Sequence, residues 1–190
     1  ITPTERPRAN LVLLVDTSGS MQPADRLPLL RTAFRMLVET LGPEDTIAIV
    51  TYAGNAAVSL EPTRIAERAK VLAAIDGLVA GGSTAGAAGL QRAYALAESG
   101  FDPKAVNRII LGTDGDFNVG IVDRRELKAF IERKRATGIY LSILGVGIGN
   151  ATSLPPMIAQ TEFARGDVQR IVSLAIATAQ ATYAFAPGTF

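Results

Sequence analysis

Residues 11–20 read LVLLVDTSGS, in which an apolar run of five residues ends at Asp16 and hydroxyl side chains follow at Ser18 and Ser20. An unbroken apolar run of this length is typical of a strand that is buried on both faces of a parallel sheet. In the turn that follows a strand, residues spaced by two can direct their side chains toward one point. The stretch therefore predicts a buried strand whose carboxyl end presents oxygen atoms.

Strand-like and helical segments alternate along the chain after this stretch. The predicted strands are 11–16, 46–52, 107–113 and 139–146, with 56–60 as an antiparallel edge strand, and the predicted helices are 26–41, 65–78, 86–98 and 124–137. Long helices between strands imply right-handed crossovers and a mainly parallel sheet covered on both faces. We expect an α/β fold with a doubly wound, mainly parallel central sheet, one antiparallel edge strand and helices on both faces.

The length of 190 residues suits one domain. Residues 1–10 contain two prolines and predict a linker, so that the expected single domain covers 11–190. Gly138 is expected to end the helix before it. In the last part of the chain, Pro155 and Pro156 interrupt any helix, and we expect a final strand at 168–172 and a final helix at 173–183.

The composition excludes several kinds of chemistry. Histidine and cysteine are absent, so a Ser-His dyad, a thiolate nucleophile, a Cys/His zinc site and disulfide bonds are all excluded. A metal would have oxygen ligands, which indicates Mg²⁺, Ca²⁺ or Mn²⁺. The net charge of +1 gives no long-range attraction to nucleic acid.

No apolar stretch approaches the ~20 residues of a membrane span, so we expect no direct membrane insertion. The chain begins with Ile1 and shows no signal peptide, so we expect a fragment of a larger multidomain protein.

Polar residues follow the predicted sheet elements at three places. Asp16 ends the first strand, Thr84 lies in the loop GGST (81–84), and Asp114 lies in TDGD (113–116) after a later strand. Ligands of open α/β sheets collect at the carboxyl ends of the strands. Each motif alone has a plain structural explanation, since Ser and Gly are common in turns and Thr84 could cap the helix that follows. Their joint occurrence favours a metal site.

These segments resemble the metal-ion-dependent adhesion site of von Willebrand factor type A domains, with DTSGS (16–20) in place of the D-x-S-x-S motif. The resemblance extends from about residue 9 to residue 149, and VTYAG (50–54) and GTDGDFNVG (112–120) are most similar to the bacterial YfbK-like branch. It implies a Rossmann-like fold. It also implies that the hydroxyls coordinate a metal directly or nearly so and that the carboxylates often act through water, which gives the ligand set Asp16, Ser18, Ser20, Thr84 and Asp114.

The function that the resemblance implies is a divalent-cation-dependent protein-binding or adhesion module, without enzymatic activity. Mg²⁺ is the expected ion, with Mn²⁺ or Ca²⁺ as alternatives. Mg²⁺ usually keeps several waters, and one of these can be replaced by an Asp or Glu carboxylate of a partner protein. The loops at 21–25, 54–57, 82–86 and 117–122 are expected to set specificity, with Met21 and Phe117 as exposed apolar contacts. The resemblance favours a location in the bacterial cell envelope, in the periplasm or outside the cell.

Two alternatives remain open from the sequence. The first is a Mg²⁺-dependent phosphate hydrolase, although no second acid follows Asp16 at the expected spacing and no phosphate-binding glycine loop follows the first strand. The second is a scaffold domain whose metal is completed by an acidic residue from elsewhere in the same protein. Nucleic acid is not an expected partner.

Overall fold

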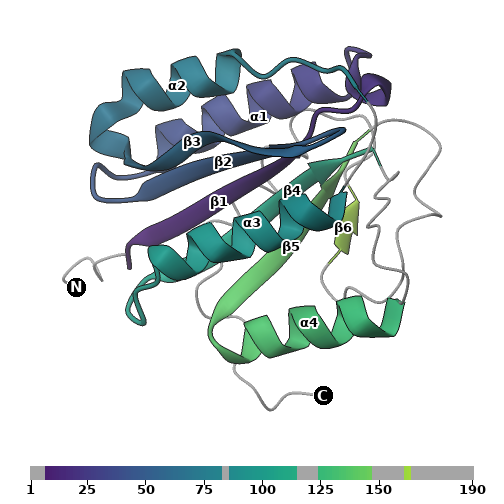
Figure 1. The fold of residues 1–190 in the computed structure, drawn as a ribbon. Coiled ribbons are helices and arrows are strands. Elements are labelled where there is room, and N and C mark those ends of the chain that lie inside the picture. Colours follow the sequence, from purple (N-terminus) through teal and green to yellow (C-terminus); the bar gives the residue numbers. More distant parts are fainter. Residues whose placement is uncertain (1–6, 83–85, 115–123, 147–160, 164–190) are drawn as a thin grey trace.

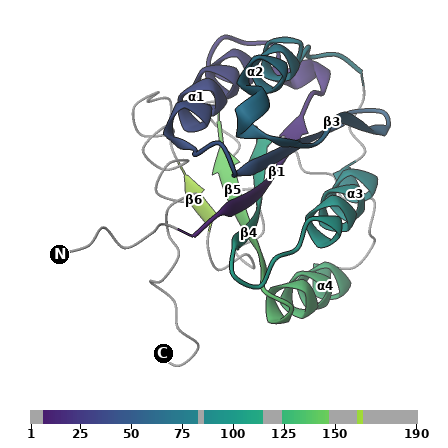
Figure 2. The same ribbon diagram turned by 90° about the vertical axis from the view of Figure 1, so that its left-hand side faces the viewer.

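The computed structural model describes residues 7–82, 86–114, 124–146 and 161–163 of the chain. A central sheet is covered by α1 and α2 on one face and by α3 and α4 on the other (Figures 1 and 2). The sheet has the strand order β3-β2-β1-β4-β5-β6. β3 is antiparallel to β2, and every other neighbouring pair is parallel. The predicted fold class is confirmed.

The strands are β1 Ala9–Asp16, β2 Thr46–Tyr52, β3 Ala56–Arg64, β4 Val106–Thr113, β5 Ile139–Gly145 and β6 Thr161–Phe163. The first five lie close to the predicted strands, although β3 extends four residues beyond the predicted 56–60. β1 begins two residues earlier than predicted, within the segment expected to be a linker. β6 was not predicted, because its three residues contain no apolar run that could signal a strand. The predicted strand at 168–172 and helix at 173–183 lie outside the described residues.

The helices are α1 Leu27–Thr40, α2 Arg68–Asp76, α3 Gly86–Ser99 and α4 Arg124–Ala136, and the short 3₁₀ turns are η1 Gly19–Met21 and η2 Ile65–Glu67. The segment predicted as one helix over 65–78 therefore divides into η2 and α2. Gly138 has a φ of 91°, a left-handed conformation that favours glycine, and it follows α4 as predicted. Within the described ranges, no helix is long and apolar enough to cross a membrane.

The apolar run of β1 is buried because both faces of the strand are covered. Leu11, Leu13 and Val15 belong to the core on the side of α1 and α2, whereas Val12 and Leu14 belong to the core on the side of α3. Complete burial of one such side chain contributes about 1.5–3 kcal/mol. The strand that carries Asp16 is thus held from both sides.

Helix α3 approaches the sheet closely at Gly89. A Cβ atom at this position would lie 2.9 Å from the Cβ of Tyr52 and 3.2 Å from Cδ1 of Leu14. Contacts below 3.0 Å require a shift of the structure, so a larger residue would push α3 away from β1 and β2. Gly89 therefore fixes the distance between α3 and the end of β2.

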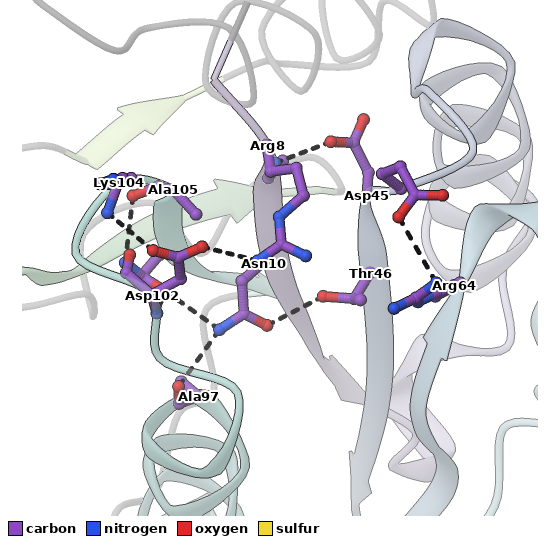
Figure 3. A network of polar contacts seen from close by, with 12 residues as sticks. Arg8, Asn10, Asp45, Thr46, Arg64, Ala97, Asp102, Lys104 and Ala105 are labelled. Carbon is purple, nitrogen blue, oxygen red and sulfur yellow. Dashed lines mark hydrogen bonds and ion pairs between the residues drawn. The ribbon is translucent and has the colours of Figure 1, made fainter.

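At the amino end of the sheet, polar side chains form a closed network (Figure 3). The buried Asn10 of β1 donates from Nδ2 to the Ala97 carbonyl at 3.2 Å and to Asn107 Oδ1 at 3.1 Å. Asn10 Oδ1 accepts a hydrogen bond from Thr46 Oγ1 at 3.1 Å. A single amide thereby joins β1 to β2, to β4 and to the end of α3.

Two carboxylates extend this network. Asp45 accepts hydrogen bonds from the backbone N–H groups of Ala9 and Gly42, each at 2.7 Å. Asp102 accepts from the Arg8 guanidinium at 2.6 Å and from the Lys104 N–H at 2.9 Å. Both carboxylates thus stabilise the start of β1 and the turns that lead into its neighbours.

Candidate metal centre

Asp16 lies at the carboxyl end of β1 and is fully buried. Its Oδ1 accepts a hydrogen bond from the Ser18 N–H at 2.8 Å. Its Oδ2 accepts from the Tyr52 hydroxyl and from Thr113 Oγ1, both at 3.2 Å. The carboxylate is therefore oriented by donors from its own loop, from the end of β2 and from the end of β4.

Burial also changes the proton affinity of this centre. Burial raises the pKa of Asp16 above its ordinary value, and the nearby carboxylate of Asp114 raises it further. The hydrogen bonds from Ser18 act in the opposite direction. Burial, together with the charge of Asp16, raises the pKa of Tyr52 well above its ordinary value. Tyr52 therefore keeps its proton and remains a donor to Asp16. The two carboxylates create negative charge in a buried place, where a cation is favoured.

The two predicted serines lie side by side. The oxygen atoms of Ser18 Oγ and Ser20 Oγ are 3.0 Å apart and share one hydrogen bond. The 3₁₀ turn η1 holds them in place, since the Met21 N–H donates to the Ser18 carbonyl at 3.0 Å. Alternate residues of the loop thus direct their hydroxyls toward one point, as the sequence predicts.

Asp114 follows β4 and is almost completely buried, with a side chain that is 1% exposed. It forms an ion pair with Nη1 of Arg26, which also donates to the Ser20 carbonyl at 2.8 Å. Arg26 therefore joins the loop after β1 to the end of β4. Arg26 was not predicted as a site residue, although a positive charge at the N-terminus of a helix is unfavourable and can indicate another role.

The loop that leads to Thr84 is joined to the loop after Asp16 through the backbone. The Gly81 N–H donates to the Thr17 carbonyl at 2.7 Å, and the Gly19 N–H donates to the Gly82 carbonyl at 3.1 Å. Gly82 adopts a φ of 92°, which favours glycine at this position. Thr84 itself lies outside the described residues, as do Asp116 and Phe117.

The expectation that Met21 is an exposed apolar contact is wrong. Its side chain is 0% exposed and belongs to the core cluster that includes Leu27 and Leu30. Met21 ends the η1 turn and is buried in the same core cluster as the first residues of α1. Met21 therefore anchors the loop from below and cannot contact a partner.

The structure brings together four of the predicted site residues, namely Asp16, Ser18, Ser20 and Asp114. Among the residues that the structure describes, no group of three or more acidic, histidine or cysteine side chains is suited to a metal ion. The donor set thus combines two carboxylates with neutral hydroxyls. All of these donors are hard oxygens, which fit Mg²⁺, Mn²⁺ or Ca²⁺ better than softer metals.

The chain is similar to known proteins in sequence and, in other cases, in fold. The chain is 48% identical over 146 residues to the protein YfbK of Escherichia coli, a match that covers 77% of this chain and 25% of YfbK. It thus spans about a quarter of that relative.

Two solved structures have the same fold at low sequence identity. One is proximal thread matrix protein 1 from the mussel byssus with a zinc-occupied MIDAS motif, with a TM-score of 0.72 and 20% identity, covering 91% of this chain and 48% of that one. The other is manganese-loaded TRAP protein of Plasmodium vivax, with a TM-score of 0.70 and 19% identity, covering 90% of this chain and 74% of that one. The sequence profile of the von Willebrand factor type A domain matches residues 11–116, more than half of the chain. The chain therefore belongs to the von Willebrand factor type A domain family.

Proposed function

We propose that the chain is a divalent-cation-dependent protein-binding module and not an enzyme. In this proposal Mg²⁺ is the physiological ion, with Mn²⁺ and Ca²⁺ able to replace it, and the ligands are Asp16, Ser18, Ser20, Thr84 and Asp114. Because the chain spans about a quarter of YfbK, we further propose that it acts as the recognition domain of a larger protein.

One observation carries the proposal. The hydroxyl oxygens of Ser18 and Ser20 lie 3.0 Å apart at the same edge of the sheet where Asp16 and Asp114 are buried. Four oxygen-bearing side chains from two distant segments thus meet where α/β folds bind ligands. The zinc-occupied MIDAS motif of the mussel protein and the manganese-loaded TRAP protein give further support.

The residues of this chain divide the work between charge and orientation. Asp16 and Asp114 supply the negative charge, and Ser18 and Ser20 supply neutral lone pairs. Three donors, the Ser18 N–H, Tyr52 and Thr113, orient Asp16. A bound ion supplies a Lewis-acid position for an external carboxylate. Since the protein provides few charged ligands, an Asp or Glu of a partner can complete the coordination.

Thermal unfolding tests the proposal with ions and an acidic probe. MgCl₂, MnCl₂ or CaCl₂ at about 100 times the dissociation constant should stabilise the wild-type chain by about 2.7 kcal/mol. For a chain of this size, that corresponds to a rise of the thermal midpoint by roughly 5–10 °C. At saturating Mn²⁺, N-acetyl-aspartate amide should raise the midpoint further, whereas N-acetyl-asparagine amide at matched ionic strength should not.

The variants separate specific ligation from general salt effects. Asp114→Ala should lose most of the rise, whereas Glu61→Ala, which removes an exposed acid of β3, should retain it. The proposal is contradicted when none of the three ions raises the wild-type midpoint. It is equally contradicted when the aspartate and asparagine probes act alike.

A further inference from the structure

Arg26 occupies a position that local preferences do not explain. It is the residue before the first turn of α1, where Ser, Thr, Asp or Asn are preferred because they accept hydrogen bonds from the helix N–H groups. The side chain of Arg26 forms no such bond. Its positive charge also lies at the positive end of the dipole of a 14-residue helix. Another interaction must therefore hold it there.

That interaction is with the predicted metal ligands. Nη1 of Arg26 pairs with Oδ2 of Asp114 and also donates to the Ser20 carbonyl at 2.8 Å. The arginine side chain is 22% exposed, and its Nε is buried with no hydrogen-bond partner in the part of the chain that the structure describes. A buried N–H without an acceptor is unfavourable. The guanidinium therefore adopts this position because of the charge on Asp114.

The guanidinium of Arg26 and a divalent ion would compete for the carboxylate of Asp114. The buried carboxylates of Asp16 and Asp114 lie at the same end of the sheet, near enough for the charge of Asp114 to raise the pKa of Asp16. Without another cation, their repulsion would destabilise the folded chain, and the guanidinium neutralises one of the two. A divalent ion bound at Asp114 would lie next to this guanidinium, and like charges at such a distance repel strongly in a buried place.

We infer that Arg26 is an internal counter-ion, which holds Asp114 in the metal-free protein and leaves it when a divalent cation binds. The inference rests on the proposed metal site and adds a property to it. The ion pair stabilises the empty site and lowers the affinity for metal. The site therefore responds to a higher range of cation concentration than its oxygen ligands alone would give.

Titration of the metal alone tests the inference. Calorimetry with MnCl₂ should show that Arg26→Gln binds at least about tenfold more tightly than the wild type, because an uncharged amide does not compete for Asp114. Without metal, the thermal midpoint of the same variant should be lower than that of the wild type. Arg35→Gln is the matched control, since Arg35 lies on the same helix and pairs with the exposed Asp76. It should bind Mn²⁺ as the wild type does.

The outcomes separate the inference from the proposed function. Equal or weaker binding by Arg26→Gln, with clear binding by the wild type, overturns the counter-ion role and leaves the metal site intact. Absence of binding by the folded wild type and by the variant overturns both.

A measurement on the wild type covers the case in which Arg26→Gln does not fold. The buried Nε–H of Arg26 should give a slowly exchanging signal in ¹⁵N nuclear magnetic resonance, identified by its loss in Arg26→Lys. Saturating Mg²⁺ should shift or broaden this signal, because the guanidinium leaves Asp114. A signal that is unchanged by Mg²⁺ overturns the inference.

Discussion

At the amino end of the sheet, polar side chains bond to one another and to the backbone, whereas at the carboxyl end two buried carboxylates lie near two serine hydroxyls. Asn10 uses both its oxygen and its amide nitrogen within the protein (Figure 3). At the other end, Ser18 and Ser20 share one hydrogen bond, and burial raises the pKa of Asp16. The amino end is therefore a structural network, and the carboxyl end carries the proposed cation site.

This difference separates stability from function along the same strand. β1 begins in the first network and ends in the second, so its two ends can be changed independently. Variants at the amino end should alter the free energy of unfolding and leave the response to metal unchanged. Variants at the carboxyl end should change the response to metal as well as the stability.

The largest effect is expected at Asp45, which is 2% exposed. Asp45→Ala removes the acceptor of the Ala9 and Gly42 N–H groups and should lower the free energy of unfolding by about 3 kcal/mol. The rise of the thermal midpoint on addition of Mn²⁺ should persist. Denaturant unfolding measures the change in the free energy of unfolding. Glu44→Ala, which removes an exposed partner of Arg64, should change it by less than about 0.5 kcal/mol. A lost response to Mn²⁺ in Asp45→Ala would show that the two ends are coupled.

A smaller effect on stability, with an effect on metal binding, is expected at Tyr52. Tyr52→Phe removes one donor to Asp16, and should cost about 1 kcal/mol of stability and weaken Mn²⁺ binding by about tenfold. Tyr94→Phe is the matched control, because the buried hydroxyl of Tyr94 has no hydrogen-bond partner among the described residues. Tyr94→Phe should leave the free energy of unfolding and the Mn²⁺ affinity nearly unchanged. Equal Mn²⁺ affinity in the two variants would remove Tyr52 from the orientation of Asp16.

The smallest effects concern the pH dependence of the metal-free protein, for which the two ends have opposite signs. The Lys104 N–H and the Arg8 guanidinium lower the pKa of Asp102, so its contribution to stability is present above its unfolded pKa and is lost as the pH falls through the folded value. Burial raises the pKa of Asp16, so its contribution is present below its unfolded pKa and is lost as the pH rises through the folded value.

The free energy of unfolding, measured with chelator from about pH 2.5 to about pH 6, tests these signs around the ordinary carboxyl pKa. Asp102→Asn should reduce the loss of stability toward acid. Asp16→Asn should reduce the loss that accompanies rising pH, because its side chain carries no charge to bury. The same slope in both variants would contradict the assignment of opposite shifts.

Most of the fold could be predicted from local sequence, because each strand of the core carries its own signal. The run LVLLV is apolar on both faces since helices cover both faces, and 46–52 was predicted with the observed bounds. β6 could not be predicted, because its three residues are strand-like only through pairing with β5.

The site could be predicted only in part. The spacing of Asp16, Ser18 and Ser20 is local, and it predicts the convergence of their side chains. Tyr52 becomes a partner of Asp16 through the register that places the two residues opposite each other in β1 and β2, and no local pattern contains that register. The position of Arg26 likewise depends on where β4 ends. The contacts that orient and neutralise the site therefore depend on the tertiary structure, whereas the motifs of the proposed ligands can be recognised in the sequence.

The close approach of α3 at Gly89 has a consequence for engineering this domain. Exposed residues of the described loop before α1, such as Gln22 and Ala24, can be substituted without loss of core packing. Gly89 cannot, since any added side chain would meet the backbone-proximal atoms of Tyr52 and displace the residue that steadies Asp16. A library of variants designed to change the proposed partner should therefore vary exposed loop residues and keep Gly89 constant.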